Sequence, residues 1–271
     1  MSSEKFFTTK KALITLIAAS LVVIVSLGIR QTFGLFFFDF NADLNISISH
    51  FGFVIGLQLL MWGVFSPIFG FITDRYGGAT AIFIGFLFYL AGLFLFYSGL
   101  NTGYLFTLTI GLLIGIGLGG TAISIPVSVV AKHFPSSNRT IATGIVTCAG
   151  SFGFFVSPLL VRYSLIEIGW EITILYFCFL LGIGLITALF ISTPKTPVGN
   201  NDNNNQTAKE ALIEAFNNKS FIFLTLGFFV CGWHIALVAT HIPTYMMDRG
   251  MPDWTAAMIL ALVGVFNMIG T

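Results

Sequence analysis

The feature that most limits the folds open to this sequence is a series of long apolar runs that recur along almost the whole chain. A helix needs about 20 apolar residues to cross the hydrocarbon core of a bilayer. Seven runs reach that length, at residues 12–38, 51–72, 79–100, 104–130, 140–161, 172–191 and 221–243. Strands of a membrane barrel would instead show about ten residues of alternating polarity, which these runs do not. The sequence therefore predicts an all-α membrane protein.

The apolar runs fall into two groups, separated by one long polar segment. This segment, residues 193–219, contains a stretch rich in Pro, Gly and Asn, followed at 208–216 by the pattern of a short amphipathic helix. We expect a six-span bundle at residues 1–192, then a linker whose helix lies along the membrane surface. Residues 220–271 would begin a second bundle with span 7 and an eighth span. Because that last run is still apolar at Thr271, we expect the chain to stop inside the eighth span.

Composition supports a membrane location and argues against several classes of protein. The chain is 56% hydrophobic and only 8% charged, whereas a soluble domain carries about 25% charged residues. A formal net charge of +1 provides no basic surface for a nucleic acid. The three cysteines lack the spacing of metal ligands, and the motifs of nucleotide-binding loops, zinc proteases and serine hydrolases are absent. We expect no enzyme activity, no cofactor and no metal site.

The distribution of basic residues predicts the orientation in the membrane. Cytoplasmic loops of membrane proteins carry an excess of Lys and Arg. Nine of the 12 Lys and Arg residues fall on the side of the N-terminus: Lys5, Lys10, Lys11, Arg75, Lys132, Arg139, Lys195, Lys209 and Lys219. Arg162 and Arg249 fall on the other side, and Arg30 lies within the first run. We therefore expect a multi-pass protein of the cell membrane whose N-terminus and linker are cytoplasmic.

A short loop motif follows the second apolar run. Its sequence, GFITDRYGG, places Gly70, Asp74, Arg75 and Gly77 at the spacing G-x-x-x-D-R-x-G. In this position the motif resembles the loop signature of the major facilitator superfamily of secondary transporters, although the basic pair that follows it in that family is replaced by a glycine and an alanine. The resemblance implies a major-facilitator helical bundle, with a complete first six-span half and the start of the second.

Further stretches are similar to the monocarboxylate and oxalate/formate porter branch of that superfamily. They lie at residues 28–37, 111–134, 139–144 and 231–246. In that branch a basic residue at the place of Arg30 is tied to the anionic substrate. The acidic-Gly-Trp opening that animal-type monocarboxylate porters carry in the first span is missing here. The resemblance implies a transporter of small organic anions, monocarboxylates or dicarboxylates, with a proton or a counter-anion as the coupling partner.

Arg30 is the residue that points most directly to a substrate. An Arg inside a span costs about 2.5–3.5 kcal/mol on insertion scales, so it usually faces a cavity or a partner. No Asp or Glu lies inside any predicted span to neutralise Arg30. An unpaired guanidinium suits a carboxylate, which it can bind at two points. The alternative is that the side chain extends along the helix to the outer headgroups.

Three other polar residues are candidates to bind the substrate. His234 and His241 lie seven residues apart on one face of the seventh span, where they can supply a second donor or a proton-coupling group. Gln58, in the second span, can line the same cavity. Each also has an ordinary structural alternative: neutral, hydrogen-bonded histidines in span 7, and a helix–helix hydrogen bond for Gln58.

The loop motif is expected to act in conformational change rather than in substrate binding. Gly70 fits a close approach of two helices, and Gly77 fits a tight turn. Asp74 and Arg75 are predicted gating residues, because a carboxylate near a helix N-terminus interacts favourably with the helix dipole. The alternative is a solvated turn with no energetic role. The resemblance adds Arg139, after the fourth span, to this group.

Together these features predict a secondary active transporter in which two bundles give alternating access to a site at mid-membrane. With no ATP-binding motif, an ion or substrate gradient would drive it. Two alternatives remain open: a facilitator transporter of another substrate, such as a drug or nutrient, and a membrane sensor or scaffold that does not transport. Further spans beyond Thr271 would favour transport, and a sensor domain there would favour the scaffold.

Overall fold

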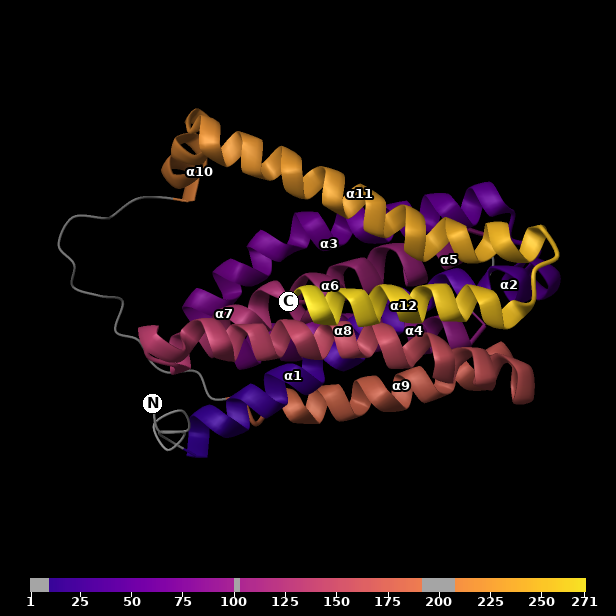
Figure 1. Cartoon of the computed structure of the whole chain (residues 1–271), viewed down its shortest axis with the longest axis horizontal. Helices are drawn as coiled ribbons and strands as arrows, with labels where there is room; N and C mark the ends of the chain where they lie inside the picture. The colour runs from indigo at the N-terminus through magenta and orange to yellow at the C-terminus, as the bar shows by residue number, and fades with distance from the viewer. Residues whose placement is uncertain (1–9, 100–102, 192–207) are drawn as a thin grey trace.

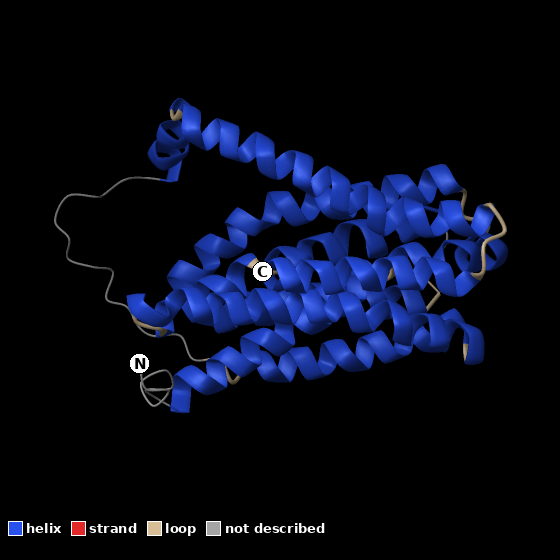
Figure 2. Ribbon diagram, viewed as in Figure 1, coloured by secondary structure: helices blue, strands red, loops and turns tan. Residues whose placement is uncertain are grey.

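The computed structural model describes residues 10–99, 103–191 and 208–271, and these ranges contain helices and turns but no strand (Figures 1 and 2). Seven helical stretches within them are long and apolar enough to cross a membrane, and a shorter apolar helix follows. The elements are α1 (Lys10–Gln31), η2 (Phe33–Phe36), α2 (Phe37–Leu44), α3 (Ile48–Tyr76), α4 (Gly78–Tyr97), α5 (Gly103–Phe106), η3 (Thr107–Leu113), α6 (Ile114–Thr121), α7 (Ser124–His133), α8 (Ser136–Glu167), α9 (Gly169–Ala188), α10 (Ala208–Asn217), α11 (Lys219–Asp248) and α12 (Asp253–Gly270). The predicted all-α membrane fold is confirmed.

The predicted spans coincide with the observed helices to within several residues. The first span runs from Lys10 to Leu44 through α1, η2 and α2, and the fourth from Gly103 to His133 through four consecutive elements. The observed helices extend beyond the apolar runs at several ends, as α8 does on both sides of residues 140–161. A helix continues into the polar headgroup region, where hydropathy no longer marks it.

The two ends of the bundle differ in chemistry. Consecutive spans run in opposite directions, so alternate loops lie at the same end. The basic end, at the left of Figure 1, carries Lys10, Lys11, Arg75, Lys132, Arg139 and Lys219. The opposite end, here called the aromatic end, contains a ring cluster around Phe40. The ring centroids of Phe96, Trp170 and Phe106 lie 5.2, 5.3 and 5.9 Å from that of Phe40. The cluster joins spans 1, 3, 4 and 6 at that end.

Glycines in the fourth span allow close packing on two sides. Gly111, Gly115 and Gly119 recur every four residues and face α3; a Cβ at Gly115 would lie 2.6 Å from a backbone oxygen of that helix. Gly117 faces α4, where a Cβ would lie 2.7 Å from a backbone oxygen. Small residues at such positions let helix backbones approach each other. Helix packing therefore accounts for the glycine-rich sequence of this span.

The first span is interrupted just beyond Arg30. The Thr32 hydroxyl donates a hydrogen bond to the Ile29 carbonyl at 2.7 Å, a local contact that competes with regular helix geometry. The 3₁₀ turn η2 follows, and its Gly34 packs directly against the backbone of α11 at Ala239. The interruption brings the first and seventh spans together toward the aromatic end.

Helices α11 and α12 contact the first six spans in different ways. The buried residues of α11 are Ala239, Thr240, Pro243 and Thr244, all in the part nearer the aromatic end. Toward the basic end, α11 diverges from α3 (Figure 1). In contrast, α12 lies along α8, where Gly264 packs against the backbone of Phe154 and Phe155. The contacts of α11 are thus concentrated near one end of the bundle.

The short helix α10 agrees with the predicted amphipathic helix to within one residue at its end. The side chains of Ile213 and Phe216 on this helix are exposed. Residues 192–207, which include the Asn-rich part of the predicted linker, lie outside the described residues. The division into two bundles joined at residues 193–219 stays a prediction.

Candidate functional site

Arg30 lies in the last turn of α1, inside the bundle rather than on its outer surface. The residue is only 4% exposed, and its Nε atom is buried without a hydrogen-bond partner among the described residues. No ion pair joins Arg30 to a carboxylate in the described ranges. Tyr89 of α4 lies near Arg30, and its hydroxyl donates to the Ser26 carbonyl at 3.4 Å. This burial does not fit a side chain that extends to the headgroups, whereas an unused donor fits a residue that receives an anion.

Gln58 is fully buried in α3 and forms a hydrogen bond to the fourth span. Its amide nitrogen donates to the Ile110 carbonyl of the π-helical segment η3 at 3.0 Å. Gln58 therefore makes the helix–helix hydrogen bond that was expected as its alternative role. Its Oε1 atom is buried with no hydrogen-bond partner among the described residues. The Oε1 atom of Gln31, beside Arg30, is also buried with no hydrogen-bond partner among the described residues. Spans 1 and 2 thus contribute several polar atoms whose hydrogen-bonding capacity is unused within the described part of the chain.

A cavity of about 850 Å³ lies between α3 and α11, and its lining is mainly apolar. It is lined by Gly52, Ile55, Gly56, Leu59, Leu60, Trp62, Gly63, Val64, Phe229, Gly232, Trp233, Ala236, Leu237, Thr240 and His241. The ring of His241 lies beside Gly52, where a Cβ would be 3.5 Å from the Cε1 atom. Of the four predicted substrate-binding residues, only His241 lines this cavity.

The structure separates the two histidines of α11. His234 is exposed, and its Nδ1 atom lies 3.0 Å from the Val230 carbonyl of the preceding turn. It therefore makes the local contact of a hydrogen-bonded helix histidine. Arg30 and Gln58 face the interior of the first six spans instead, so the four residues do not converge on one described cavity.

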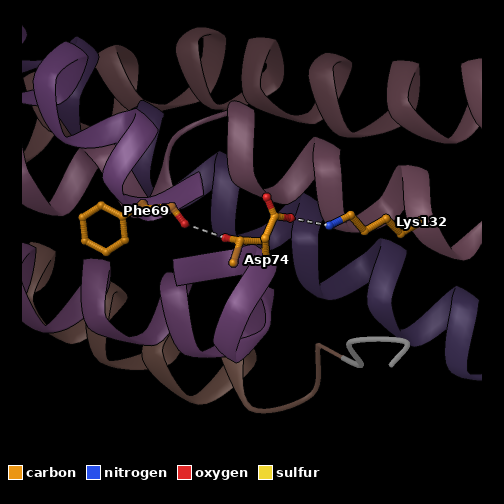
Figure 3. Close-up of polar contacts among 4 residues, drawn as sticks. Phe69, Asp74 and Lys132 are labelled. Atoms are coloured by element: carbon orange, nitrogen blue, oxygen red, sulfur yellow. Dashed lines mark hydrogen bonds and ion pairs between the residues drawn. The ribbon is translucent and has the colours of Figure 1, made fainter. Parts of the chain in front are cut away.

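The loop motif lies at the basic end, where α3 meets α7 and α4. Asp74 is in the last turn of α3, and its Oδ1 lies 2.9 Å from the Lys132 Nζ at the end of α7 (Figure 3). The neighbouring Thr73 hydroxyl donates to the Phe69 carbonyl at 2.8 Å. Asp74 lies in the last turn of a helix rather than in the first, and its observed partner is a lysine side chain from the fourth span, not the helix N-terminus expected from the sequence. The pair ties spans 2 and 4 together at this end.

The other motif residues have individual environments. Gly77 separates α3 from α4 with φ 97° and ψ 151°, so the predicted tight turn is present. A Cβ at Gly70 would meet no atom within 4 Å, so no described helix approaches closely there. The Arg75 guanidinium lies 5.5 Å from the ring centroid of Tyr76. Arg139 is exposed in the first turn of α8.

One polar contact between α8 and α12 was not anticipated from the sequence. The Asn267 side-chain amide donates to the Ser151 hydroxyl at 2.8 Å, and Ser151 donates in turn to the Thr147 carbonyl at 3.3 Å. An amide within an apolar run is a signal that could have identified Asn267. Its partner could not have been identified, because 116 residues separate the two.

The sequence matches the profile of the Major Facilitator Superfamily over residues 19–271. The chain belongs to this superfamily. Among curated relatives, it is 24% identical to the agnestins efflux protein AgnL12 of Paecilomyces divaricatus, over 97% of this chain and 59% of that protein. It is 23% identical to the hexuronate transporter of Bacillus subtilis, over 84% of this chain and 55% of the relative. A probable nitrate transporter of Staphylococcus epidermidis is 24% identical to this chain, over 85% of this chain and 57% of that protein.

A solved structure supports the superfamily fold. The D-xylose–proton symporter superimposes on this chain with a TM-score of 0.69 at 15% identity, covering 95% of this chain and 66% of the symporter. Our chain spans between one half and two thirds of the length of these superfamily proteins. The comparisons do not distinguish the monocarboxylate and oxalate/formate branch, because the relatives are named for hexuronate, nitrate and efflux.

Two features of the described structure bear on ligand binding. One is the polar interior around Arg30, and the other is the apolar cavity between α3 and α11. Within the described ranges, no group of three His, Cys, Asp or Glu side chains can hold a metal ion.

Proposed function

We propose that this protein is a secondary active transporter of small organic anions, with monocarboxylates or dicarboxylates as the expected class. Transport would occur by alternating access, driven by a gradient of ions or of a second substrate. The basic end would face the cytoplasm, because cytoplasmic loops are enriched in Lys and Arg. The observation that carries the proposal is the buried Arg30, whose Nε has no partner among the described residues.

The electrostatics of Arg30 favour an anionic ligand. A buried charge is stabilised only when it is paired and hydrogen-bonded. No described carboxylate provides that pairing, so the negative charge would come from the transported molecule. A carboxylate accepts two parallel hydrogen bonds from a guanidinium, which fixes its orientation as well as its position.

The names of two relatives support an anion, although not one particular anion. Hexuronate is a hydroxylated carboxylate and nitrate is an inorganic oxyanion, and both carry a negative charge that an arginine can bind. The resemblance to monocarboxylate and oxalate/formate porters stays a prediction within this wider class.

The arrangement of α11 supports alternating access. Gly34 of the first span packs on α11 at Ala239, toward the aromatic end. The remainder of α11 diverges from α3 toward the basic end (Figure 1). Contact at one end with separation at the other is the arrangement expected of a rocking transporter that is open on one side. With the basic end in the cytoplasm, this state would be inward-facing.

The test of the anion proposal is the substitution Arg30→Gln. It should abolish uptake of labelled lactate, oxalate and glucuronate into membrane vesicles while leaving expression and insertion unchanged. Because a charge-assisted hydrogen bond is worth roughly 1.5–3 kcal/mol, its loss should weaken binding by about ten- to a hundredfold. Arg30→Lys should retain part of the uptake, since the charge remains and the two-point contact is lost.

The matched control is Arg249→Gln. Arg249 is exposed at the aromatic end, with its guanidinium over the ring of Tyr245, so its substitution should leave uptake unchanged. Uptake by Arg30→Gln with the half-saturation concentration and rate of the parent protein would remove the main support for an anionic substrate.

A second candidate function is the efflux of a larger apolar molecule. The observation in its favour is the cavity of about 850 Å³, whose lining is almost entirely apolar, a size within the range of sites for drug-sized ligands. The relative AgnL12 is named as an efflux protein. Filling this cavity with Gly56→Leu should block efflux of an apolar compound, whereas Arg30→Gln should not.

A further inference from the structure

The contact between Ser151 and Asn267 places a polar pair in the middle of the membrane-spanning region. Ser151 follows the start of α8 at Ser136 by 15 residues and precedes its end at Glu167 by 16 residues. Asn267 belongs to α12, in which Gly264 packs on the backbone of α8 and the residues one and two turns earlier, Leu260 and Ala256, are buried. The pair therefore lies at mid-membrane depth in apolar surroundings.

The two residues differ in exposure, which suggests different roles. Ser151 is 1% exposed; its hydroxyl oxygen accepts a hydrogen bond from the Asn267 amide, and its hydroxyl donates one to the Thr147 carbonyl. Asn267 is exposed, and it shares a surface hollow of about 560 Å³ with Ile259, Leu262, Val263 and Phe266. The buried serine fixes the orientation of the exposed amide.

The Asn267 side chain has hydrogen-bonding capacity that the Ser151 contact does not use. An asparagine amide carries two donor hydrogens and an acceptor oxygen. One hydrogen is directed to Ser151, and the described residues provide no partner for the oxygen. An exposed amide at mid-membrane depth is costly against lipid, so polar groups at this depth face the interior of a helix bundle or a water-filled cavity.

We propose that Asn267, held in place by Ser151, forms hydrogen bonds with the transported molecule, and that its ligand class is the hydroxylated carboxylates. The second part rests on the anion transport proposed above. The fixed amide offers a donor and an acceptor together, and a hydroxyl group is the partner that accepts and donates at the same time. An oxyanion without hydroxyls only accepts, so it would leave the amide oxygen unpaired. Arg30 would bind the carboxylate, and Asn267 would bind a hydroxyl.

The first experiment asks whether position 267 faces water. Cysteine is introduced as Asn267→Cys or Ile269→Cys in a chain whose Cys148, Cys178 and Cys231 are replaced by alanine. Each variant is placed in lipid nanodiscs, which leave both membrane faces accessible, and treated with a trimethylammonium methanethiosulfonate. Ile269 is the control because it is exposed two residues away, outside the hollow that Asn267 lines.

Only an ionised thiol in contact with water reacts with this reagent, and an apolar environment suppresses ionisation. The Asn267→Cys variant should therefore react at least about tenfold faster than Ile269→Cys. Equal rates at the two positions would mean that Asn267 faces lipid, and the proposal would be wrong.

The second experiment measures binding of D-glucuronate and of acetate to the purified chain through the shift in thermal unfolding that each ligand produces. The loss of one neutral hydrogen bond weakens binding by about fivefold. Both Asn267→Ala and Ser151→Ala should therefore weaken glucuronate binding by about this factor and leave acetate binding unchanged. The ratio of the two affinities is the informative quantity, because a general loss of packing would weaken both ligands alike.

The outcomes separate this inference from the proposed function. Absence of glucuronate binding to the parent chain, or an unchanged affinity ratio in Asn267→Ala, overturns the role of Asn267. An unchanged ratio in Ser151→Ala alone overturns the positioning role of Ser151. If Arg30→Gln binds glucuronate as the parent does while Asn267→Ala does not, the role of Asn267 stands and the anion site at Arg30 fails.

Discussion

At Gly77 the backbone conformation leaves almost no choice of side chain. Its φ of 97° and ψ of 151° fall in a region that is essentially restricted to glycine. This geometry reverses the chain between α3 and α4 within one residue. Asp74 lies three residues before this turn, in the last turn of α3, where its carboxylate meets Lys132.

The loop motif offers a matched pair of glycines for testing this strain. Gly77→Ala should lower the free energy of unfolding by about 1–3 kcal/mol, because any Cβ is strained at these dihedral angles. Gly70→Ala should be neutral or slightly stabilising, because Gly70 lies within α3 and a Cβ there meets no atom within 4 Å. Thermal unfolding of the purified variants in one detergent measures both. Equal stability of the two variants would show that the turn relaxes without strain.

Single residues also show what could and could not be predicted from the sequence. Asp74 and Gly77 were recognisable because they belong to a motif that follows an apolar run, and Arg30 because it is a charge inside an apolar run. The partner of Asp74 was not recognisable, since Lys132 is 58 residues away. The pair is largely exposed, so it contributes at most about 1 kcal/mol, and no compositional signal marks it.

At the scale of elements, the fourth span shows how glycine spacing determines helix packing. The stripe at Gly111, Gly115 and Gly119 lets α3 approach closely enough for Gln58 to reach the Ile110 carbonyl. That carbonyl belongs to a π-helical segment, in which the regular pattern of backbone bonds is altered. The glycine pattern and the buried glutamine are thus parts of one contact between spans 2 and 4.

A substitution in the stripe should therefore disturb both packing and hydrogen bonding. Gly115→Ala would place its Cβ 2.6 Å from the Gln58 carbonyl oxygen and 2.7 Å from the Met61 Cβ. Overpacking of this kind costs typically about 1–3 kcal/mol. Gly144→Ala, in α8, is the control, since a Cβ there meets nothing within 4 Å. Thermal unfolding should show a lower transition temperature for Gly115→Ala only, and an unchanged value would mean that the helices separate at little cost.

Hydropathy predicted the positions of the spans but not their interruptions. The break after Thr32 and the π-helical segment near Ile110 both lie within continuous apolar sequence. They coincide with a local hydroxyl–carbonyl bond and with a hydrogen bond from another helix, neither of which changes the mean hydropathy. Prediction of the candidate site had the same limit. Polar residues within spans could be identified from the sequence, but the cavity that each one faces could not.

At the scale of the whole molecule, the two ends give the bundle a direction. Most of the described basic side chains lie at one end, and the ring cluster around Phe40 occupies the other. Trp170 adds a polar contact to the aromatic end, because its Nε1 donates to Asp43 at 2.6 Å. The first and seventh spans also meet toward this end, so it is the more tightly closed of the two. Which compartment each end faces determines whether this state is open to the cytoplasm.

The orientation can be tested with one cysteine at each end of a variant that lacks the three native cysteines. Tyr104 is 94% exposed at the aromatic end, and Ser137 is exposed at the basic end. An excess of Lys and Arg marks cytoplasmic loops, so Tyr104→Cys should react with an impermeant maleimide in intact cells. Ser137→Cys should react only after the membrane is permeabilised. The reverse pattern would place the basic end outside and make the state seen here outward-facing, whereas labelling of both sites in intact cells would indicate a mixed orientation.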